Sequence, residues 1–124
     1  MWRYLNKNPL ARDTNDCVIR SISCAESRSW DDVYMELSKL AQEQGIILDD
    51  VNFVEPYLDS KYSRICYNNE DSTMTVEDFI KTNPQGTFLV TMRGHITCVK
   101  DGVLYDTFDC RNRKIWCAWE VARS

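Results

Sequence analysis

Apolar residues recur with a helical period in two early segments of the chain, at about 100° per residue. In the first segment, residues 17–27, the apolar arc holds Val18, Ile19, Ile22 and Ala25. In the second, residues 30–44, it holds Trp30, Val33, Tyr34, Leu37, Leu40 and Ala41, with Gln44 on the same side. Both patterns predict amphipathic helices that bury one face in a core.

Residues suited to helix ends frame these two segments. Asn15 and Asp16, both good N-cap residues, precede the first segment. Ser29 precedes the second and is followed three residues later by Asp32, a capping-box variant with Asp in place of Glu. Gly45 comes directly after the second segment, as C′ glycines do.

From residue 87 onward the pattern becomes that of β-strands. Short apolar-rich runs lie at 87–92, 95–100, 103–107 and 116–121. Asp101-Gly102 separates the second run from the third, which predicts a hairpin with a two-residue turn. Helices that come first and an antiparallel sheet that comes last predict an α+β fold, formed by residues 1–124 as a single domain.

The remaining segments carry weaker signals. Residues 1–16 are predicted to be a loop that packs Trp2 and Tyr4 on the domain, and residues 46–48 a short strand or an extended link. A short helix is predicted at 51–62, where Pro56 breaks or kinks it, and another at 75–81. Between these helices, residues 66–74 are predicted to form a short strand that runs into a polar loop with Glu70 and Asp71.

Composition narrows the classes of function. The 124 residues carry a net charge of −4, which argues against binding to a nucleic-acid backbone. The chain has no apolar run long enough to span a membrane and no apolar core of a signal peptide near its start. We therefore expect a cytoplasmic protein with reduced thiols and no nucleic-acid or membrane partner.

The cysteines and the single histidine argue against a metal centre. The six cysteines contain no Cys-x-x-Cys pair, and His95 is the only histidine. Zinc sites need several such ligands at close spacing, so we expect no metal and no cofactor.

His95 has a predicted partner on the neighbouring strand of the hairpin. With Asp101-Gly102 as the turn, Thr97 lies opposite Asp106. Alternation then makes His95 and Asp106 diagonal neighbours on one face, roughly 7–8 Å apart at the backbone. Asp109 points to the other face unless a bulge intervenes. Asp106 is therefore the expected carboxylate beside the histidine, where it would fix the tautomer and favour the imidazolium.

Cys17 is the cysteine best placed to act with His95. It begins a predicted helix, where positive potential lowers a thiol pKa and free N–H groups can stabilise an oxyanion. Cys24 lies in mid-helix and Cys98 points away from the face of His95. The candidate catalytic set is thus Cys17, His95 and Asp106.

This order of residues resembles the papain-like cysteine peptidase superfamily. The resemblance rests on NDCVIRSIS around Cys17 and on RGHITCVKDGVLYDTFD around His95 and Asp106. It is closest to small, compact members that are common in bacteria and their phages. It implies N-terminal helices packed on a C-terminal antiparallel β-sheet, with Cys17 as nucleophile, His95 as base and Asp106 as orienting group. The implied activity is that of a thiol hydrolase, a peptidase or amidase that cleaves a peptide or amide bond through a thioester.

Two positions depart from the pattern of the larger papain-type enzymes. Ala11 stands where those enzymes carry an oxyanion-hole glutamine, and Val18 replaces the aromatic residue that often follows the nucleophile. Asn15, Thr14 or the backbone N–H of Cys17 would then have to line the oxyanion hole.

Other interpretations of the same residues stay open. Cys17 can be a small buried residue, His95 a strand residue satisfied by a neighbour, and Asp106 a cap for the following turn. A non-catalytic binding or inhibitor protein on the same fold, one that sequesters a small molecule or a protein partner, would carry the same sequence pattern. A structural protein is the third class.

Overall fold

The structure is a computed structural model that describes residues 1–67 and 73–122. Its helices are α1 (Cys17–Glu26), α2 (Trp30–Gln44), α3 (Val51–Asp59) and α4 (Val76–Thr82). Its strands are β1 (Trp2–Tyr4), β2 (Arg64–Cys66), β3 (Thr87–Met92), β4 (His95–Lys100), β5 (Val103–Asp106) and β6 (Ile115–Ala122). The fold is therefore α+β, as the sequence predicts.

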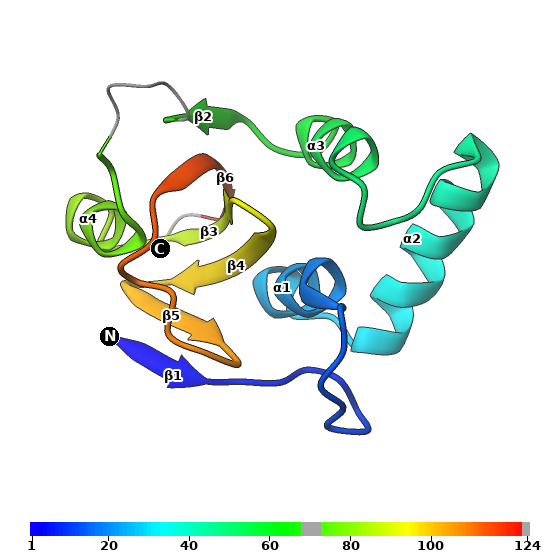
Figure 1. Cartoon of the computed structure of the whole chain (residues 1–124), viewed down its shortest axis with the longest axis horizontal. Helices are drawn as coiled ribbons and strands as arrows, with labels where there is room; N and C mark the ends of the chain where they lie inside the picture. The colour runs from blue at the N-terminus through cyan, green and yellow to red at the C-terminus, as the bar shows by residue number, and fades with distance from the viewer. Residues whose placement is uncertain (68–72, 123–124) are drawn as a thin grey trace.

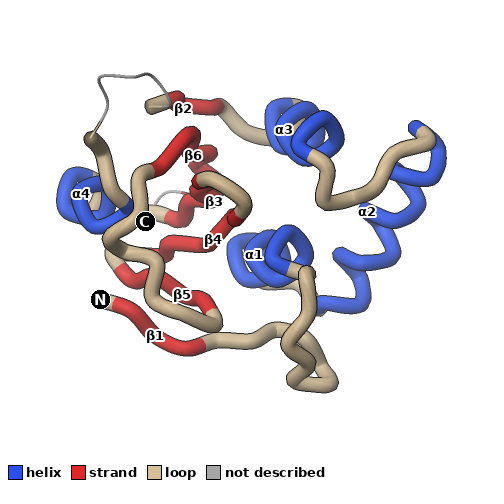
Figure 2. The backbone as a smooth tube through the Cα atoms, in the orientation of Figure 1, coloured by secondary structure: helices blue, strands red, loops and turns tan. Residues whose placement is uncertain are grey.

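The strands form one sheet in the order β1-β5-β4-β3-β6-β2 (Figure 1). Helix α4 lies on one side of the sheet and α1 and α3 on the other, with α2 beyond α1 (Figure 2). The first strand pairs in parallel with β5, whereas the other pairs are antiparallel. None of the described helices is long and apolar enough to cross a membrane.

Side chains that alternate along the strands contribute to two hydrophobic cores, one on each face of the sheet. Leu89, Ile96 and Cys98 point toward α1 and join the cluster that also contains α2 and α3. Their neighbours Val90 and Val99 join a second cluster with α4. Because side chains alternate along a strand, a slip of one residue would exchange the two sets.

The structure confirms the predicted positions of the first two helices. Helix α1 begins at Cys17, and α2 begins after Ser29, whose hydroxyl accepts a hydrogen bond of 3.1 Å from the backbone N–H of Asp32. Gly45 follows α2 with a φ of 67°, a left-handed conformation that glycine adopts without strain. Tyr34 departs from its predicted place in the core, because it is 42% exposed and stacks on Trp30 instead.

The predicted loop at 1–16 is wrong at its beginning. Residues Trp2–Tyr4 form β1, which lies along β5 and covers an edge that would otherwise be unpaired. Three residues are too few to show alternation, which is why the pattern does not reveal this strand. The aromatic side chains are largely exposed rather than packed in the core, Trp2 at 36% and Tyr4 at 65%. The sheet is consequently mixed, not purely antiparallel, and draws strands from both ends of the chain.

Pro56 does not end the third helix. Asp50 caps α3 by accepting a hydrogen bond of 2.8 Å from the backbone N–H of Asn52, and the helix continues through Pro56 to Asp59. Proline has no backbone N–H, so the carbonyl of Asn52, four residues earlier, lacks its helical hydrogen bond. Asn52 is exposed, and water can donate to this carbonyl instead. Residues 46–48 form a link rather than a strand. Residues 68–72 of the predicted polar loop, which include Glu70 and Asp71, lie outside the described residues.

The hairpin has the predicted register. Lys100 pairs with Val103, Val99 with Leu104 and Cys98 with Tyr105. Asp101 and Gly102 both have positive φ angles, 47° and 78°, as a two-residue turn of this kind requires.

Leu37 provides a test of the core around α1 and α2. It is fully buried, so Leu37→Ala leaves a cavity and should lower the free energy of unfolding by about 2–5 kcal/mol. Met35 on the same helix is 68% exposed, and Met35→Ala is the matched control that should change it by less than about 0.5 kcal/mol. Denaturant unfolding followed by circular dichroism measures both, and equal losses would contradict the packing of α2.

Candidate active site

Cys17, His95 and Asp106 meet at one place although they come from three elements. Cys17 begins α1, His95 begins β4 and Asp106 ends β5. His95 Nε2 lies 2.6 Å from Asp106 Oδ2, which leaves Nδ1 as the free ring nitrogen. Cys17 and His95 line the same cavity, and His95 lowers the pKa of the Cys17 thiol. The thiol, the imidazole and the carboxylate are therefore close enough to act on one another electrostatically.

A tight turn places the histidine. Strands β3 and β4 are joined by Arg93 and Gly94, so that Met92 pairs directly with His95. Gly94 has a φ of 71°, which L side chains rarely adopt, so glycine suits this turn. The ring of Phe108 lies against His95 with centroids 4.8 Å apart, and only 7% of the histidine side chain is exposed. The imidazole is thus held in one orientation.

The charges of the site favour a thiolate and an imidazolium. Burial by itself would raise the pKa of Cys17, but the hydrogen bond and charge of His95 lower it below the usual 9.0. Burial would likewise lower the pKa of His95, but the hydrogen bonds with Asp106 and then Cys17 raise it to about 9. A lowered thiol pKa beside a raised imidazole pKa is what an ion pair near neutral pH requires.

The structure distinguishes the two candidate carboxylates. Asp106 is buried, and although burial raises its pKa, the hydrogen bond from His95 contributes to a net lowering. Asp109 instead binds Arg111, with Oδ2 2.8 Å from Nη2. The predicted contact between His95 and Asp106 is therefore present, while Asp109 faces elsewhere.

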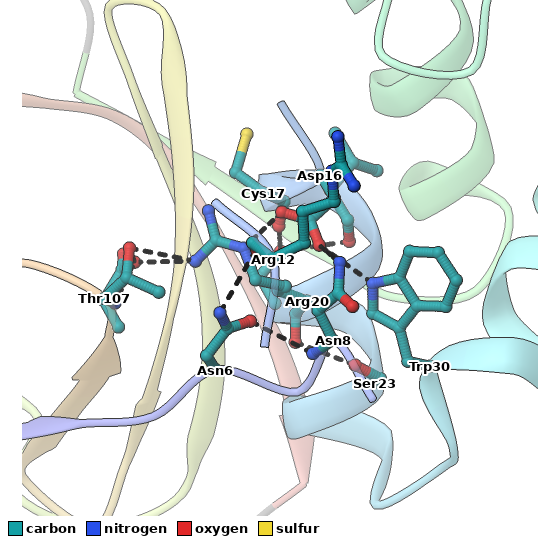
Figure 3. Close-up of polar contacts among 12 residues, drawn as sticks. Asn6, Asn8, Arg12, Asp16, Cys17, Arg20, Ser23, Trp30 and Thr107 are labelled. Atoms are coloured by element: carbon teal, nitrogen blue, oxygen red, sulfur yellow. Dashed lines mark hydrogen bonds and ion pairs between the residues drawn. The ribbon is translucent and has the colours of Figure 1, made fainter. Parts of the chain in front are cut away.

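Arg20 connects the helix to the strand that carries Asp106. Its Nε donates to Asp16 Oδ1 at 2.6 Å, and its Nη1 donates to Asp106 Oδ1 at 3.2 Å and to Thr107 Oγ1 at 3.3 Å. Figure 3 shows the guanidinium between Asp16 and Thr107, with the Cys17 sulfur outside this network. The two aspartates are 5% and 3% exposed in their side chains, so Arg20 neutralises charges that water barely reaches.

Asp16 occupies the N-cap position of α1 but does not cap the helix with its side chain. Its carboxylate accepts hydrogen bonds from Arg20, from Trp30 Nε1 at 2.9 Å and from Asn8 Nδ2 at 3.2 Å. None of the described residues accepts a hydrogen bond from the backbone N–H of Cys17, the first residue of the helix, so this N–H is available to a substrate oxygen.

A cavity of about 340 Å³ opens beside the thiol. Its lining includes Asn15, Cys17 and His95, so one of the predicted oxyanion-hole side chains lies in the same cavity as Cys17. Thr14 lines a neighbouring hollow of about 660 Å³ instead. The two hollows share Asn15 and Asp49.

The other five cysteines have different surroundings. The interaction of Cys24 and Cys98 with each other lowers the pKa of Cys24 and raises that of Cys98, but both are buried in the core. Burial raises the pKa of Cys110 and of Cys117 to about 12. Cys66 is exposed on the edge strand β2, with its Sγ 2.6 Å from that of Cys117. Cys17 alone, among the six, combines partial exposure with a lowered pKa and a basic partner.

His95, Asp106 and Cys110 are also a conceivable metal-binding set, because their ligand atoms lie within 4.8 Å of one another. Two features oppose a cation there. The Arg20 guanidinium already supplies positive charge to Asp106, and a metal would need the thiolate of Cys110, whose pKa is raised by burial and then by the charge of Asp106. The donor set therefore fits a metal poorly.

Arg20, Trp30 and Cys110 are parts of the site that the sequence interpretation missed. The four-residue spacing of Asp16 and Arg20 on one helix is a signal that could have revealed their ion pair. Nothing in the local sequence indicates that Arg20 also reaches Asp106, since the two are 86 positions apart.

Comparison with protein-family models, with curated proteins and with solved structures found no match for this chain.

The Asp106→Asn variant tests the electrostatics of the site. Loss of the carboxylate should lower the pKa of His95 and so raise that of Cys17. Each unit of increase lowers the thiolate fraction about tenfold at a pH below that pKa. Alkylation of Cys17 by iodoacetamide, followed by mass spectrometry between about pH 5 and 9, should shift to higher pH. Asp109→Asn is the matched control and should keep the wild-type profile. Identical profiles for the two variants would contradict the assignment of Asp106.

Arg20→Met tests the link between α1 and β5. It removes the cation that two buried carboxylates share, so we expect a loss of about 3–5 kcal/mol in the free energy of unfolding. Arg20→Lys should recover only part, because an ammonium lacks the planar fork that reaches both partners. Arg12→Met is the control: Arg12 is exposed and its side chain makes no ion pair with any described residue. A loss below about 1 kcal/mol in denaturant unfolding, as for surface pairs, would contradict a structural role for Arg20.

Proposed function

We propose that this protein is a cysteine-dependent hydrolase of papain-like type that cleaves a peptide or amide bond through a thioester. The observation that carries the proposal is that Cys17 and His95 line one cavity of about 340 Å³, with His95 Nε2 held 2.6 Å from Asp106 Oδ2. The order of the three residues, with the cysteine opening a helix and its partners on adjacent strands, is that of the superfamily the sequence resembles. The papain-like fold is part of this proposal.

Acylation starts from the thiolate and imidazolium. Cys17 Sγ attacks the carbonyl carbon of the substrate, and the electron pair of the C=O bond moves onto oxygen. The backbone N–H of Cys17 and the side chain of Asn15 would stabilise that oxyanion, since both residues line the cavity. As the intermediate collapses, the C–N bond breaks and the His95 Nδ1–H protonates the leaving amine. The acyl group remains on Cys17 as a thioester, and His95 is neutral.

Deacylation restores the starting charges. Neutral His95 takes a proton from water, and the hydroxide formed attacks the thioester carbonyl. Collapse of this second intermediate releases a carboxylic acid and expels the Cys17 thiolate beside the imidazolium. Asp106 stays ionised throughout and holds the ring in the orientation that both steps need.

The pH dependence follows from the direction of the two pKa shifts. Activity should rise with pH as Cys17 loses its proton, which happens below the usual thiol value of 9.0. It should fall as His95 loses its proton near pH 9, because the leaving amine then has no acid. A bell-shaped profile of kcat/KM against pH, with its alkaline limb near pH 9, is expected.

The experiment combines thiol labelling with turnover. Iodoacetamide at neutral pH should label Cys17 before the exposed Cys66, and Cys17→Ser should remove that label while Cys66→Ser keeps it. Incubation with a peptide library should give cleaved products and a transient acyl adduct on Cys17, seen by intact-mass spectrometry. An unreactive Cys17 would refute the hydrolase. A Cys17→Ala variant that retains the protein's full effect on a bound partner would favour the binding protein on the same fold.

A further inference from the structure

The cavity beside Cys17 is mainly apolar in its walls. Val18, Val54 and Met92 form its buried part, and Val51 and Trp116 form its exposed part. Val51 is 51% exposed and Trp116 is 38% exposed, so both present apolar surface that nothing in the described chain covers. A side chain with a long hydrocarbon stem would cover such surface.

The same lining carries two carboxylates that differ in their partners. Glu55 is bound by Arg64, with Oε1 2.8 Å from Nη1. Asp49 is exposed, and across residues 1–67 and 73–122 its side chain has no ion pair or hydrogen bond. Within the cavity the charge of His95 is matched by that of Cys17. Asp49 is therefore the carboxylate of this lining that no described cation pairs with, and it lies beside an apolar wall.

The position of Asp49 also bears on the size of the substrate. Asp49 and Asn15 line both this cavity and the neighbouring hollow of about 660 Å³. That hollow continues past Ile47, which is 70% exposed, to Tyr34 on α2. Two adjoining hollows fit an extended polypeptide better than a free amino acid or a small amide.

We propose that the substrate is a polypeptide with a lysine or arginine next to the cleaved bond, whose stem lies on Val51 and Trp116 and whose cationic end binds Asp49. The inference rests on the proposed hydrolase activity and adds the class of substrate. Asp49 is then the residue that determines specificity for charge, and its attraction for the substrate weakens as salt increases.

The test uses fluorogenic peptides that differ at one residue, scanned on both sides of the cleaved bond. Lysine is compared with norleucine, which keeps the stem and lacks the charge, and with glutamate. We expect kcat/KM for lysine or arginine to exceed that for norleucine at least about fivefold at low salt, and the ratio to fall at high salt. Asp49→Asn should bring the ratio close to one, and Asp49→Lys should favour glutamate. Asp13→Asn, an exposed acid outside both hollows, is the control that should keep the wild-type ratio.

Each outcome is decisive when iodoacetamide labelling of Cys17 is measured alongside. A reactive Cys17 with equal rates for lysine and norleucine at every position overturns the charge specificity and leaves the hydrolase standing. A preference that survives in Asp49→Asn overturns the role of Asp49. A reactive Cys17 that cleaves no peptide overturns the polypeptide substrate. An unreactive Cys17 overturns the hydrolase and, with it, this inference.

Discussion

A guanidinium buried between two carboxylates fixes the beginning of α1 relative to the end of β5. Arg20 reaches Asp16 one turn earlier on its own helix and Asp106 on the strand, and all three side chains are nearly excluded from water. Such charges are costly to bury unless they are paired, so the arrangement holds only when helix and strand are docked together. The ion pair between Arg64 and Glu55 is more exposed, so screening by solvent leaves it only a small contribution to the stability of the fold. This contact therefore helps to fix the position of Cys17, at the start of α1, relative to His95, the histidine that Asp106 binds.

The electrostatics of the thiol follow from that docking. Cys17 is held where His95 can donate to it, and Asp106 supplies the negative charge that keeps the imidazole protonated. Asp106 thus faces two cations, His95 on Oδ2 and Arg20 on Oδ1. One carboxylate therefore both orients the imidazole and joins it to the helix that carries Cys17.

The two-sided sheet protects the geometry of the site. Strand β4 sends Ile96 and Cys98 into the core with α1, and Val99 into the core with α4. Since both faces are buried, a slip of register would place the wrong side chains in both cores at once. The diagonal relation of His95 and Asp106 is therefore maintained by the packing of residues that take no part in the chemistry. The free edge of β5 is closed by β1, whose Trp2 donates to the backbone carbonyl of Asp106 at 3.2 Å.

Periodic and local patterns in the sequence were sufficient to predict much of the fold of this protein. The α+β class, the starts of α1 and α2, the hairpin register and the contact between His95 and Asp106 all follow from alternation, helix caps and a two-residue turn, which depend on neighbours in sequence. The parallel strand β1 and the reach of Arg20 to Asp106 depend on segments far apart in the chain. The same is true of the cavity, where Asp49 and Trp116 come together with Cys17. Sequence alone thus determined which residues could do chemistry on a local element, whereas only the tertiary structure decided which of them share a buried, charged environment, because burial and Coulomb interactions depend on distance in space.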